Sequence, residues 1–245
     1  MVDIHSHILP DVDDGPKSWE VAEAMCRMAL EDGIEHMVAT PHSNDRYHYD
    51  RDYLSRMLDE LRRRVSTGLK LTLGCDFHLS YENIQDAMRN PARYTIEGTP
   101  YLLVELSNYS VPPNIGDTLM RLADCGMTPI LTHPERNPIL QKSPTRVLEW
   151  AAAGVIVQLT ASALTGSWGE NAQHMAEWLL HRNAVHVLAS DAHDTSRRTP
   201  GLSAARVRAS KICGDEVARA LVKDNPNAIV NGAALPHCPP VDCRP

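Results

Sequence analysis

Potential metal ligands in this sequence stand at the ends of short apolar runs. The first run ends in His5 and His7, and the alternation of side chains along a strand places both imidazoles on one side. The last run ends in Asp191 and His193, while Glu105 interrupts a run that is otherwise apolar. A buried carboxylate needs a cation or an ion-pair partner. The candidate ligands that follow or interrupt such runs are His5, His7, His42, Asp76, Glu105, His133, Asp191 and His193.

Nitrogen and carboxylate ligands without thiolates suit Mn²⁺, Zn²⁺ or Fe²⁺. A set of this size is sufficient for two or three ions, and a carboxylate can bridge two ions about 3.5–4 Å apart. A single His or Asp after a strand is more often a turn former or a helix cap, so the prediction depends on the whole set. We interpret the other histidines as structural or surface residues. These are His36, His48, His78, His174, His181, His186 and His237.

Arginines close to the candidate ligands form a second signal. Arg136 follows His133 by three residues, and Arg197 and Arg198 come shortly after His193. A planar guanidinium group can bind two oxygens of a phosphate group at once. The alternative is that these arginines are ordinary surface residues.

The elements that must position these residues alternate along the whole chain. Short β-type runs cover residues 2–5, 36–40, 70–75, 101–106, 128–132, 155–159 and 186–190. Amphipathic helices with i, i+3, i+4, i+7 spacing are expected near residues 18–32, 51–65, 115–125, 144–153, 170–182 and 203–221. Ser18 is the expected N-cap of the first helix, and Gly33 marks its C-terminal end.

Strands that alternate with helices predict a parallel sheet. Two architectures fit this order, an open doubly wound sheet and a closed βα barrel. We favour the barrel, because nearly every run ends in a candidate ligand and a barrel brings all its strand ends to one mouth. Since no repeat, linker or change of composition indicates a second domain, residues 1–235 are expected to form a single domain.

The composition limits the possible partners and location. The chain has 245 residues, with 24 Lys and Arg against 31 Asp and Glu, and its net charge of −7 argues against nucleic acid or an anionic membrane surface as the main partner. We see no signal-like start and no apolar segment of about 18 residues, so we expect a soluble cytoplasmic protein without stable membrane insertion. The six cysteines form no Cys-x-x-Cys pair and are expected to be reduced thiols. The proline-rich tail 236–245 is expected to be a frayed end.

Four segments of the chain resemble the polymerase and histidinol phosphatase (PHP) family. They are His5-Ser6-His7, Asp11-Val12-Asp13-Asp14-Gly15-Pro16-Lys17-Ser18, Thr132-His133-Pro134-Glu135-Arg136 and Ala189-Ser190-Asp191-Ala192-His193. The opening sequence, residues 3–16, is similar to that of the bacterial PHP-type tyrosine phosphatases of capsule and exopolysaccharide operons. This opening motif is highly specific, and the resemblance extends from Met1 to about Asn231.

The resemblance implies an α/β fold, a distorted seven-stranded (β/α)7 TIM-like barrel of PHP type, with a trinuclear metal site. Two or three divalent ions are expected, with Mn²⁺ first and Zn²⁺ or Fe²⁺ as alternatives. Carried over by position, one ion is held by His5, His7, Asp76 and Asp191, a second by Asp76, Glu105 and His133, and a third by Asp14, His42 and His193. Asp76 departs from the family's usual glutamate at the bridging position, and its shorter side chain is expected to move the metal pair or weaken one ion.

These features predict hydrolysis of a phosphomonoester by in-line attack of a water molecule that the metal ions activate. Arg136 and Arg198 would neutralise the phosphoryl oxygens. Asp191 and His193 are expected on the leaving-group side, where His193 would assist proton transfer. No Cys-x5-Arg loop follows a strand, which argues against a cysteine phosphoenzyme.

Three functions fit the sequence. The first is a protein-tyrosine phosphatase that acts on the tyrosine-rich tail of a kinase of polysaccharide synthesis. The second is a small-molecule phosphatase such as histidinol phosphatase, and the third is a catalytically idle PHP module that serves a partner protein. The nearly complete ligand set argues against the third function, and the opening motif favours the first.

Overall fold

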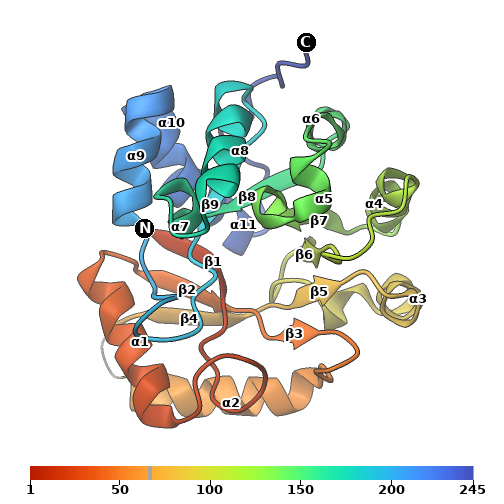
Figure 1. Cartoon of the computed structure of the whole chain (residues 1–245). Coiled ribbons are helices and arrows are strands. Elements are labelled where there is room, and N and C mark those ends of the chain that lie inside the picture. Colours follow the sequence, from red (N-terminus) through yellow and green to blue (C-terminus); the bar gives the residue numbers. More distant parts are fainter. Residues whose placement is uncertain (66–67, 245) are drawn as a thin grey trace.

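The computed structural model describes residues 1–65 and 68–244, with the strands in the middle of the molecule and helices around them (Figure 1). The strands are β1 (Val2–Ser6), β2 (His36–Ala39), β3 (His42–Ser43), β4 (Lys70–Leu73), β5 (Asp76–His78), β6 (Tyr101–Glu105), β7 (Thr128–Thr132), β8 (Ile156–Thr160) and β9 (Val187–Ala189). Their pairings are parallel. One sheet has the order β1-β2-β4, and the other has the order β3-β5-β6-β7-β8-β9. The predicted α/β fold with parallel strands is confirmed.

Each predicted strand run contains a strand, but two further short strands, β3 and β5, follow the predicted runs 36–40 and 70–75 after a break. β2 ends at Ala39 and β3 begins at His42, beyond Pro41, which has no N–H to donate to the ladder. β4 and β5 are separated in the same way at Gly74. Hydrogen bonds cross the break, because the N–H of Gly74 donates to the oxygen of Ala39 at 2.8 Å and the N–H of Asp76 donates to the oxygen of Pro41 at 3.2 Å. Backbone hydrogen bonds therefore continue from one sheet to the other at this seam.

A second seam joins the end of β1 to the segment after β9. An isolated parallel bridge pairs Ser6 with Ala192. The N–H of His7 donates to the oxygen of Ala192 at 2.8 Å, and the N–H of Asp191 donates to the oxygen of His5 at 2.9 Å. The two segments that carry His5 and His7, and Asp191 and His193, are thereby held side by side.

A β-bulge in β1 separates the apolar interior from the candidate ligands. The pairing of β1 with β2 changes register between Asp3 and Ser6. Ile4 belongs to a buried apolar cluster that α11 (Asn225–Val230) joins at the amino ends of the strands. His5, the next residue, lies among the candidate ligands instead. A bulge re-aims neighbouring side chains in this way, and period-two alternation alone does not predict it.

Helices cover the outside of the strands. They are α1 (Trp19–Glu31), α2 (Arg51–Arg64), α3 (Tyr81–Arg89), α4 (Ile115–Asp124), α5 (Pro138–Gln141), α6 (Thr145–Ala152), α7 (Ala161–Leu164), α8 (Glu170–His181), α9 (Ser203–Cys213), α10 (Asp215–Arg219) and α11, with the helical turns η1 (Pro91–Arg93), η2 (Pro134–Arg136) and η3 (Ala220–Asp224). Ser18 accepts a hydrogen bond from the N–H of Val21, which confirms the predicted N-cap. The single helix predicted over 203–221 is wrong, because Gly214, with φ of 87°, ends α9 and separates it from α10. None of the described helices is long and apolar enough to cross a membrane.

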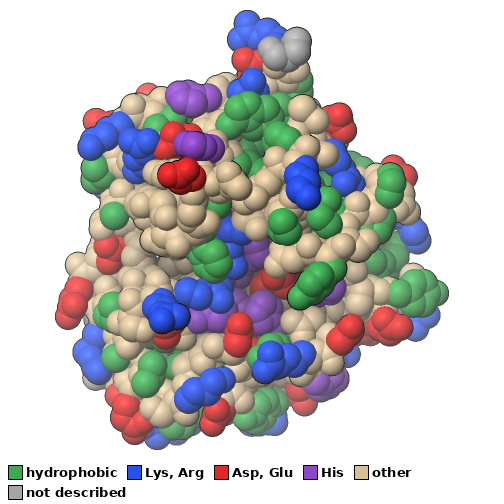
Figure 2. Space-filling model, viewed as in Figure 1, with side chains coloured by type: hydrophobic (Ala, Val, Ile, Leu, Met, Phe, Trp, Pro, Cys, Tyr) green, Lys and Arg blue, Asp and Glu red, His purple; other side chains and the backbone are tan. Residues whose placement is uncertain are grey.

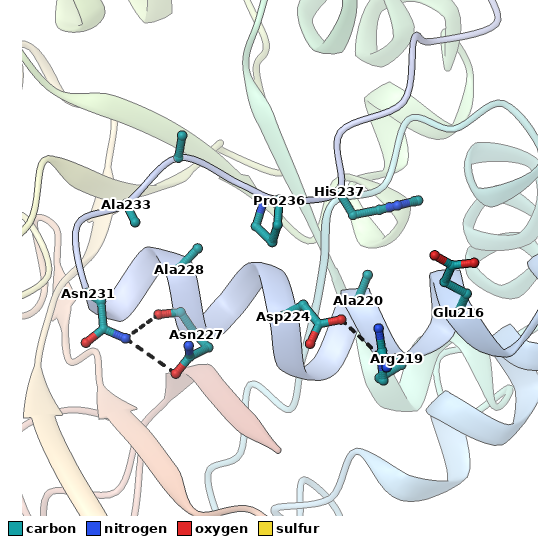
Figure 3. Close-up of a pocket in the computed structure, with 11 residues that line it drawn as sticks. Glu216, Arg219, Ala220, Asp224, Asn227, Ala228, Asn231, Ala233, Pro236 and His237 are labelled. Carbon is teal, nitrogen blue, oxygen red and sulfur yellow. Dashed lines mark hydrogen bonds and ion pairs between the residues drawn. The ribbon is translucent and has the colours of Figure 1, made fainter.

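The expectation of a frayed end at 236–245 is wrong for the described residues 236–244, which are attached to the molecule. The side-chain amide of Asn225 donates to the oxygen of His237 at 2.7 Å, and the N–H of Asp242 donates to the oxygen of Arg182 at 2.8 Å. A cavity of about 650 Å³ lies between α10, α11 and the start of this tail (Figure 3). Its lining contains none of the candidate ligands and consists of Glu216, Arg219, Ala220, Asp224, Asn227, Ala228, Asn231, Ala233, Ala234, Pro236 and His237.

Asp3 links the first strand to the end of the last. Its carboxylate is buried and accepts hydrogen bonds from the N–H of Ser190 at 3.0 Å and from its hydroxyl at 2.5 Å. Asp3→Ala would leave both donors without a partner, so we expect the free energy of unfolding to fall by about 1–3 kcal/mol. Asp124→Ala, at an exposed position, should change it by less than about 0.5 kcal/mol. Urea denaturation measures both, and an equal effect of the two substitutions would contradict this role of Asp3.

Candidate active site

The candidate ligands lie together at the carboxyl ends of the strands. Figure 2 shows histidine side chains gathered in the middle of one face, next to basic and acidic side chains. The possible ligand atoms form four overlapping groups, and within each group they lie within 4.8 Å of one another. The groups are His7-Asp14-His42-His193, His5-His7-Asp76, His5-His133-Asp191 and His42-Asp76-Glu105. Every metal ligand predicted from the sequence belongs to at least one of these groups.

His5 and His7 form the centre of the cluster. Their Nε2 atoms are 3.4 Å apart, so the two imidazoles share one side of the chain as predicted. Oδ1 of Asp191 lies 3.4 Å from Nε2 of His5 and 3.5 Å from Nε2 of His7. Oδ2 of Asp76 lies 3.6 Å and 4.0 Å from the same two nitrogens. These four side chains are the ones that the resemblance implies for the first ion.

Asp14 joins two further histidines at the rim of the cluster. Its Oδ1 lies 3.3 Å from Nε2 of His42 and 3.2 Å from Nε2 of His193. The Asp14 side chain is 45% exposed, whereas those of His42 and His193 are only 12% and 4% exposed. The three residues implied for the third ion are therefore together, on the side of the cluster that faces solvent.

Glu105 and His133 are arranged differently from the implied second set. Nδ1 of His42 lies 3.1 Å from Oδ2 of Asp76 and 3.6 Å from Oε2 of Glu105. Nε2 of His133 lies 3.9 Å from Oε1 of Glu105 and groups with ligands of the first set. His42 thus stands beside the two carboxylates, where the resemblance places His133.

Two of these residues have an unusual backbone conformation. The φ angle is 34° at His133 and 51° at Asp191. The left-handed region costs a non-glycine residue about 1–3 kcal/mol, and such residues are concentrated at functional sites. Hydrogen bonds hold the strained segments, because the N–H of His133 donates to the oxygen of Gln158 and the N–H of Asp191 donates to the oxygen of His5, both at 2.9 Å.

Two buried residues orient the central imidazoles. Oδ2 of Asp13 lies 2.6 Å from Nδ1 of His7, and Oε1 of Gln158 lies 2.9 Å from Nδ1 of His5. With Nδ1 occupied, Nε2 of each ring remains for a metal ion. Neither residue was expected from the sequence to have a role in the site. Gln158 interrupts an apolar run as Glu105 does, and Asp13 lies in the opening motif, so a signal was present for both.

The carboxylates of Asp76 and Glu105 have pKa values that move in opposite directions. Burial raises the pKa of Asp76, but His5 and His42 outweigh burial and hold this pKa well below its usual range. Burial, together with the neighbouring Asp76, raises the pKa of Glu105 to about 8. A cation at this point would favour the ionised form of both groups.

Buried atoms without a hydrogen-bond partner mark where cations fit. Among the described residues, both carboxylate oxygens of Asp76, Oδ1 of Asp191 and Nδ1 of His42 are buried and have no hydrogen-bond partner. Groups of this kind are costly when nothing compensates them. Imidazole nitrogens and carboxylate oxygens suit divalent transition ions. The residues present therefore fit divalent metal ions.

Asp191 connects this cluster to two arginines. Its Oδ2 accepts a hydrogen bond from Nη1 of Arg136 and another from Nη2 of Arg198, the latter at 2.6 Å. Nε of each arginine is buried and has no partner among the described residues, so both guanidinium groups keep donors for an anion. Of the two candidate arginines that follow His193, Arg197 is exposed, whereas Arg198 contacts the cluster through Asp191.

The family model described as "Capsular polysaccharide synthesis, CpsB/CapC" matches residues 1–231. This chain belongs to the CpsB/CapC family. CapC of Staphylococcus aureus is 34% identical over 202 residues, which are 81% of this chain and 79% of CapC. Tyrosine-protein phosphatase CpsB of Streptococcus pneumoniae is 28% identical over 239 residues, 94% of this chain and 98% of CpsB. The resemblance to the capsule phosphatases that the opening motif indicated is confirmed.

Solved structures agree with the CpsB/CapC assignment. A chain from the crystal structures of YwqE from Bacillus subtilis and CpsB from Streptococcus pneumoniae, described as metal-dependent tyrosine phosphatases, matches with a TM-score of 0.92 and 27% identity over 100% of both chains. The lactonase Lmo2620 from Listeria monocytogenes matches with a TM-score of 0.61 and 12% identity over 95% of each chain. This second likeness concerns the fold alone.

Asp13→Ala tests whether support of His7 matters for metal binding. Without the carboxylate the imidazole loses the group that fixes its orientation, so we expect the affinity for Mn²⁺ to fall about 10–100-fold. Calorimetric titration of the metal-free protein measures this change. Asp11→Asn is the control, because Asp11 is exposed in the same loop and should leave the affinity unchanged. Wild-type affinity in Asp13→Ala would show that other contacts hold His7.

Proposed function

We propose that this chain is a metal-dependent phosphomonoester hydrolase, and specifically a protein-tyrosine phosphatase. The observation that carries the proposal is the position of Asp191, which joins the ligand cluster to Arg136 and Arg198. Metal ions beside guanidinium groups suit a phosphoryl group, whose charge must be neutralised during transfer. The family supports the same conclusion, since the relatives CpsB and YwqE are named tyrosine-protein phosphatases.

The proposed cofactors are two or three divalent ions, with Mn²⁺ first and Zn²⁺ or Fe²⁺ as alternatives. Such ions, when bound, stabilise phosphoryl oxygens and lower the pKa of a water ligand towards neutral pH. The residues proposed to hold them are His5, His7, Asp14, His42, Asp76, Glu105, His133, Asp191 and His193.

The chain's own residues bind the phosphoryl group and handle the proton. Arg136 and Arg198 are proposed to bind its non-bridging oxygens, and Asp191 holds the two arginines at one carboxylate oxygen. His193 has two candidate roles, as a ligand of the third ion or as the donor of a proton to the leaving oxygen. Both roles use Nε2, because Nδ1 is hydrogen-bonded to the backbone oxygen of Asp191 at 2.9 Å.

For the architecture, we propose that residues 1–235 form one domain and that the two sheets act as a single distorted (β/α)7 barrel of PHP type. The hydrogen bonds at both seams support this arrangement. Residues 236–245 are then a tail outside the barrel. The proposed location is the cytoplasm, where a kinase of polysaccharide synthesis would expose its phosphorylated segment.

For the substrate, we propose a phosphotyrosine protein, most simply a tyrosine kinase of capsule or exopolysaccharide synthesis. The tyrosyl ring is long enough to carry the phosphate past the rim that Asp14 and Arg198 form. Phosphoserine would bring the peptide backbone against this rim before its phosphate met the ligands. The alternative is a small-molecule phosphatase of the histidinol phosphatase type.

Metal removal should abolish the activity. We expect dialysis against EDTA to stop hydrolysis and Mn²⁺ to be among the ions that restore it, because the reaction is proposed to depend on ions held by the ligand cluster. His5→Ala removes a central ligand and should lower kcat at least about 100-fold. Activity is measured with a phosphotyrosine peptide. Full turnover in excess EDTA, or an unchanged rate in His5→Ala, would contradict the metal mechanism.

Substrate choice is tested by a comparison of kcat/KM on the Mn²⁺-loaded enzyme. The substrates are a phosphotyrosine peptide, the matching phosphoserine peptide and histidinol phosphate. We expect the phosphotyrosine peptide to be preferred, because loss of in-line geometry penalises the shorter side chain. A preference for histidinol phosphate by about tenfold or more, roughly 1.4 kcal/mol in transition-state binding, would replace the proposal with the small-molecule alternative.

A further inference from the structure

Trp168 contacts both arginines that the proposed function uses. The centroid of its indole ring lies 3.6 Å from Cζ of Arg136 and 5.5 Å from Cζ of Arg198. Both distances are within the range of a cation–π interaction. The side chain is 36% exposed, so it forms part of the surface around the site. Neither the ligand pattern nor the opening motif pointed to this residue.

Hydrogen bonds within the loop hold Trp168 in place. Nε1 of Trp168 donates to Oγ of Ser162 at 2.9 Å, and the N–H of Ser167 donates to the oxygen of Ser162 at 2.9 Å. Gly166 and Gly169, with φ of 93° and 84°, supply the two turns on either side of the indole. The ring is therefore held from its edge by the segment that follows β8, which leaves its face for the guanidinium groups.

The two arginines need support beyond their shared acceptor. Both donate to Oδ2 of Asp191, and Nη1 of Arg136 also donates to Oγ1 of Thr160 at 3.3 Å, so one carboxylate oxygen balances the charge of two guanidinium groups. The other oxygen of Asp191 lies among the histidines of the metal cluster, where a bound cation would draw its charge away from the arginines. An aromatic face attracts a guanidinium without occupying its N–H donors, which stay available for phosphate oxygens.

We infer that Trp168 is a positioning residue, which holds Arg136 and Arg198 where they bind the phosphoryl group. The inference rests on the proposed function, because it takes these arginines as the phosphate ligands. It differs from a direct role of the indole against the substrate's tyrosyl ring. A positioning role affects any phosphate that binds, whereas a ring contact affects aryl phosphates alone.

The test compares Trp168→Leu and Trp168→Phe on the Mn²⁺-loaded enzyme. Leu keeps apolar bulk but has no aromatic face, and Phe restores that face. Calorimetry measures the affinity for inorganic phosphate, and kinetics with 4-nitrophenyl phosphate separate KM from kcat. Trp178→Leu is the matched control, since Arg182 lies 4.0 Å over that ring but outside the candidate ligand set.

We expect Trp168→Leu to lower the affinity for inorganic phosphate at least about tenfold. The affinity of Trp168→Phe should stay within about threefold of that of the wild type. Trp178→Leu should bind phosphate as the wild type does, and Mn²⁺ affinity should be the same in all three variants.

The inference would be overturned if the phosphate affinity of Trp168→Leu stayed within twofold of that of the wild type. This holds even if its KM for the aryl phosphate rises, because a ring contact would explain that rise. Equal losses in Leu and Phe, or a wild type that binds no phosphate, would overturn it as well. If the enzyme binds phosphate but does not hydrolyse phosphotyrosine peptides, only the proposed substrate is contradicted, and the inference about Trp168 stands.

Discussion

The two oxygens of Asp191 serve different halves of the site. Oδ1 lies 3.4–3.5 Å from the central imidazoles of His5 and His7, and Oδ2 accepts hydrogen bonds from Arg136 and Arg198. One buried carboxylate therefore fixes the distance between the proposed metal ions and the proposed phosphate ligands. This requires a left-handed backbone at Asp191, which the hydrogen bond from its N–H to the oxygen of His5 holds in place.

The rest of the site depends on charge that cannot be left uncompensated. Asp76 is buried with both oxygens free of hydrogen bonds from described residues, while burial and Asp76 itself hold the pKa of Glu105 at about 8. Like charges at this density destabilise the fold unless cations lie between them. Asp13 and Gln158 hold the imidazoles at Nδ1, so their Nε2 atoms are directed at the same space. The arrangement favours metal binding over an empty polar core.

The fold provides this geometry through its irregularities. The bulge in β1 lets Ile4 pack in the apolar interior while the adjacent His5 joins the ligands. The breaks at Pro41 and Gly74 turn two strands before they reach the mouth, so that His42 and Asp76 stand in register across the new pair β3 and β5.

The sequence by itself determined the parallel α/β fold, the family and the residues of the cluster, because ligand types at strand ends are a local pattern that a parallel topology brings together. It also marked Arg136 and Arg198. Only the tertiary structure decided that His42, rather than His133, forms one group with Asp76 and Glu105, and that Asp13 and Gln158 support the imidazoles. Those contacts join segments up to 153 residues apart, and they depend on register shifts and side-chain directions that spacing along the chain does not contain.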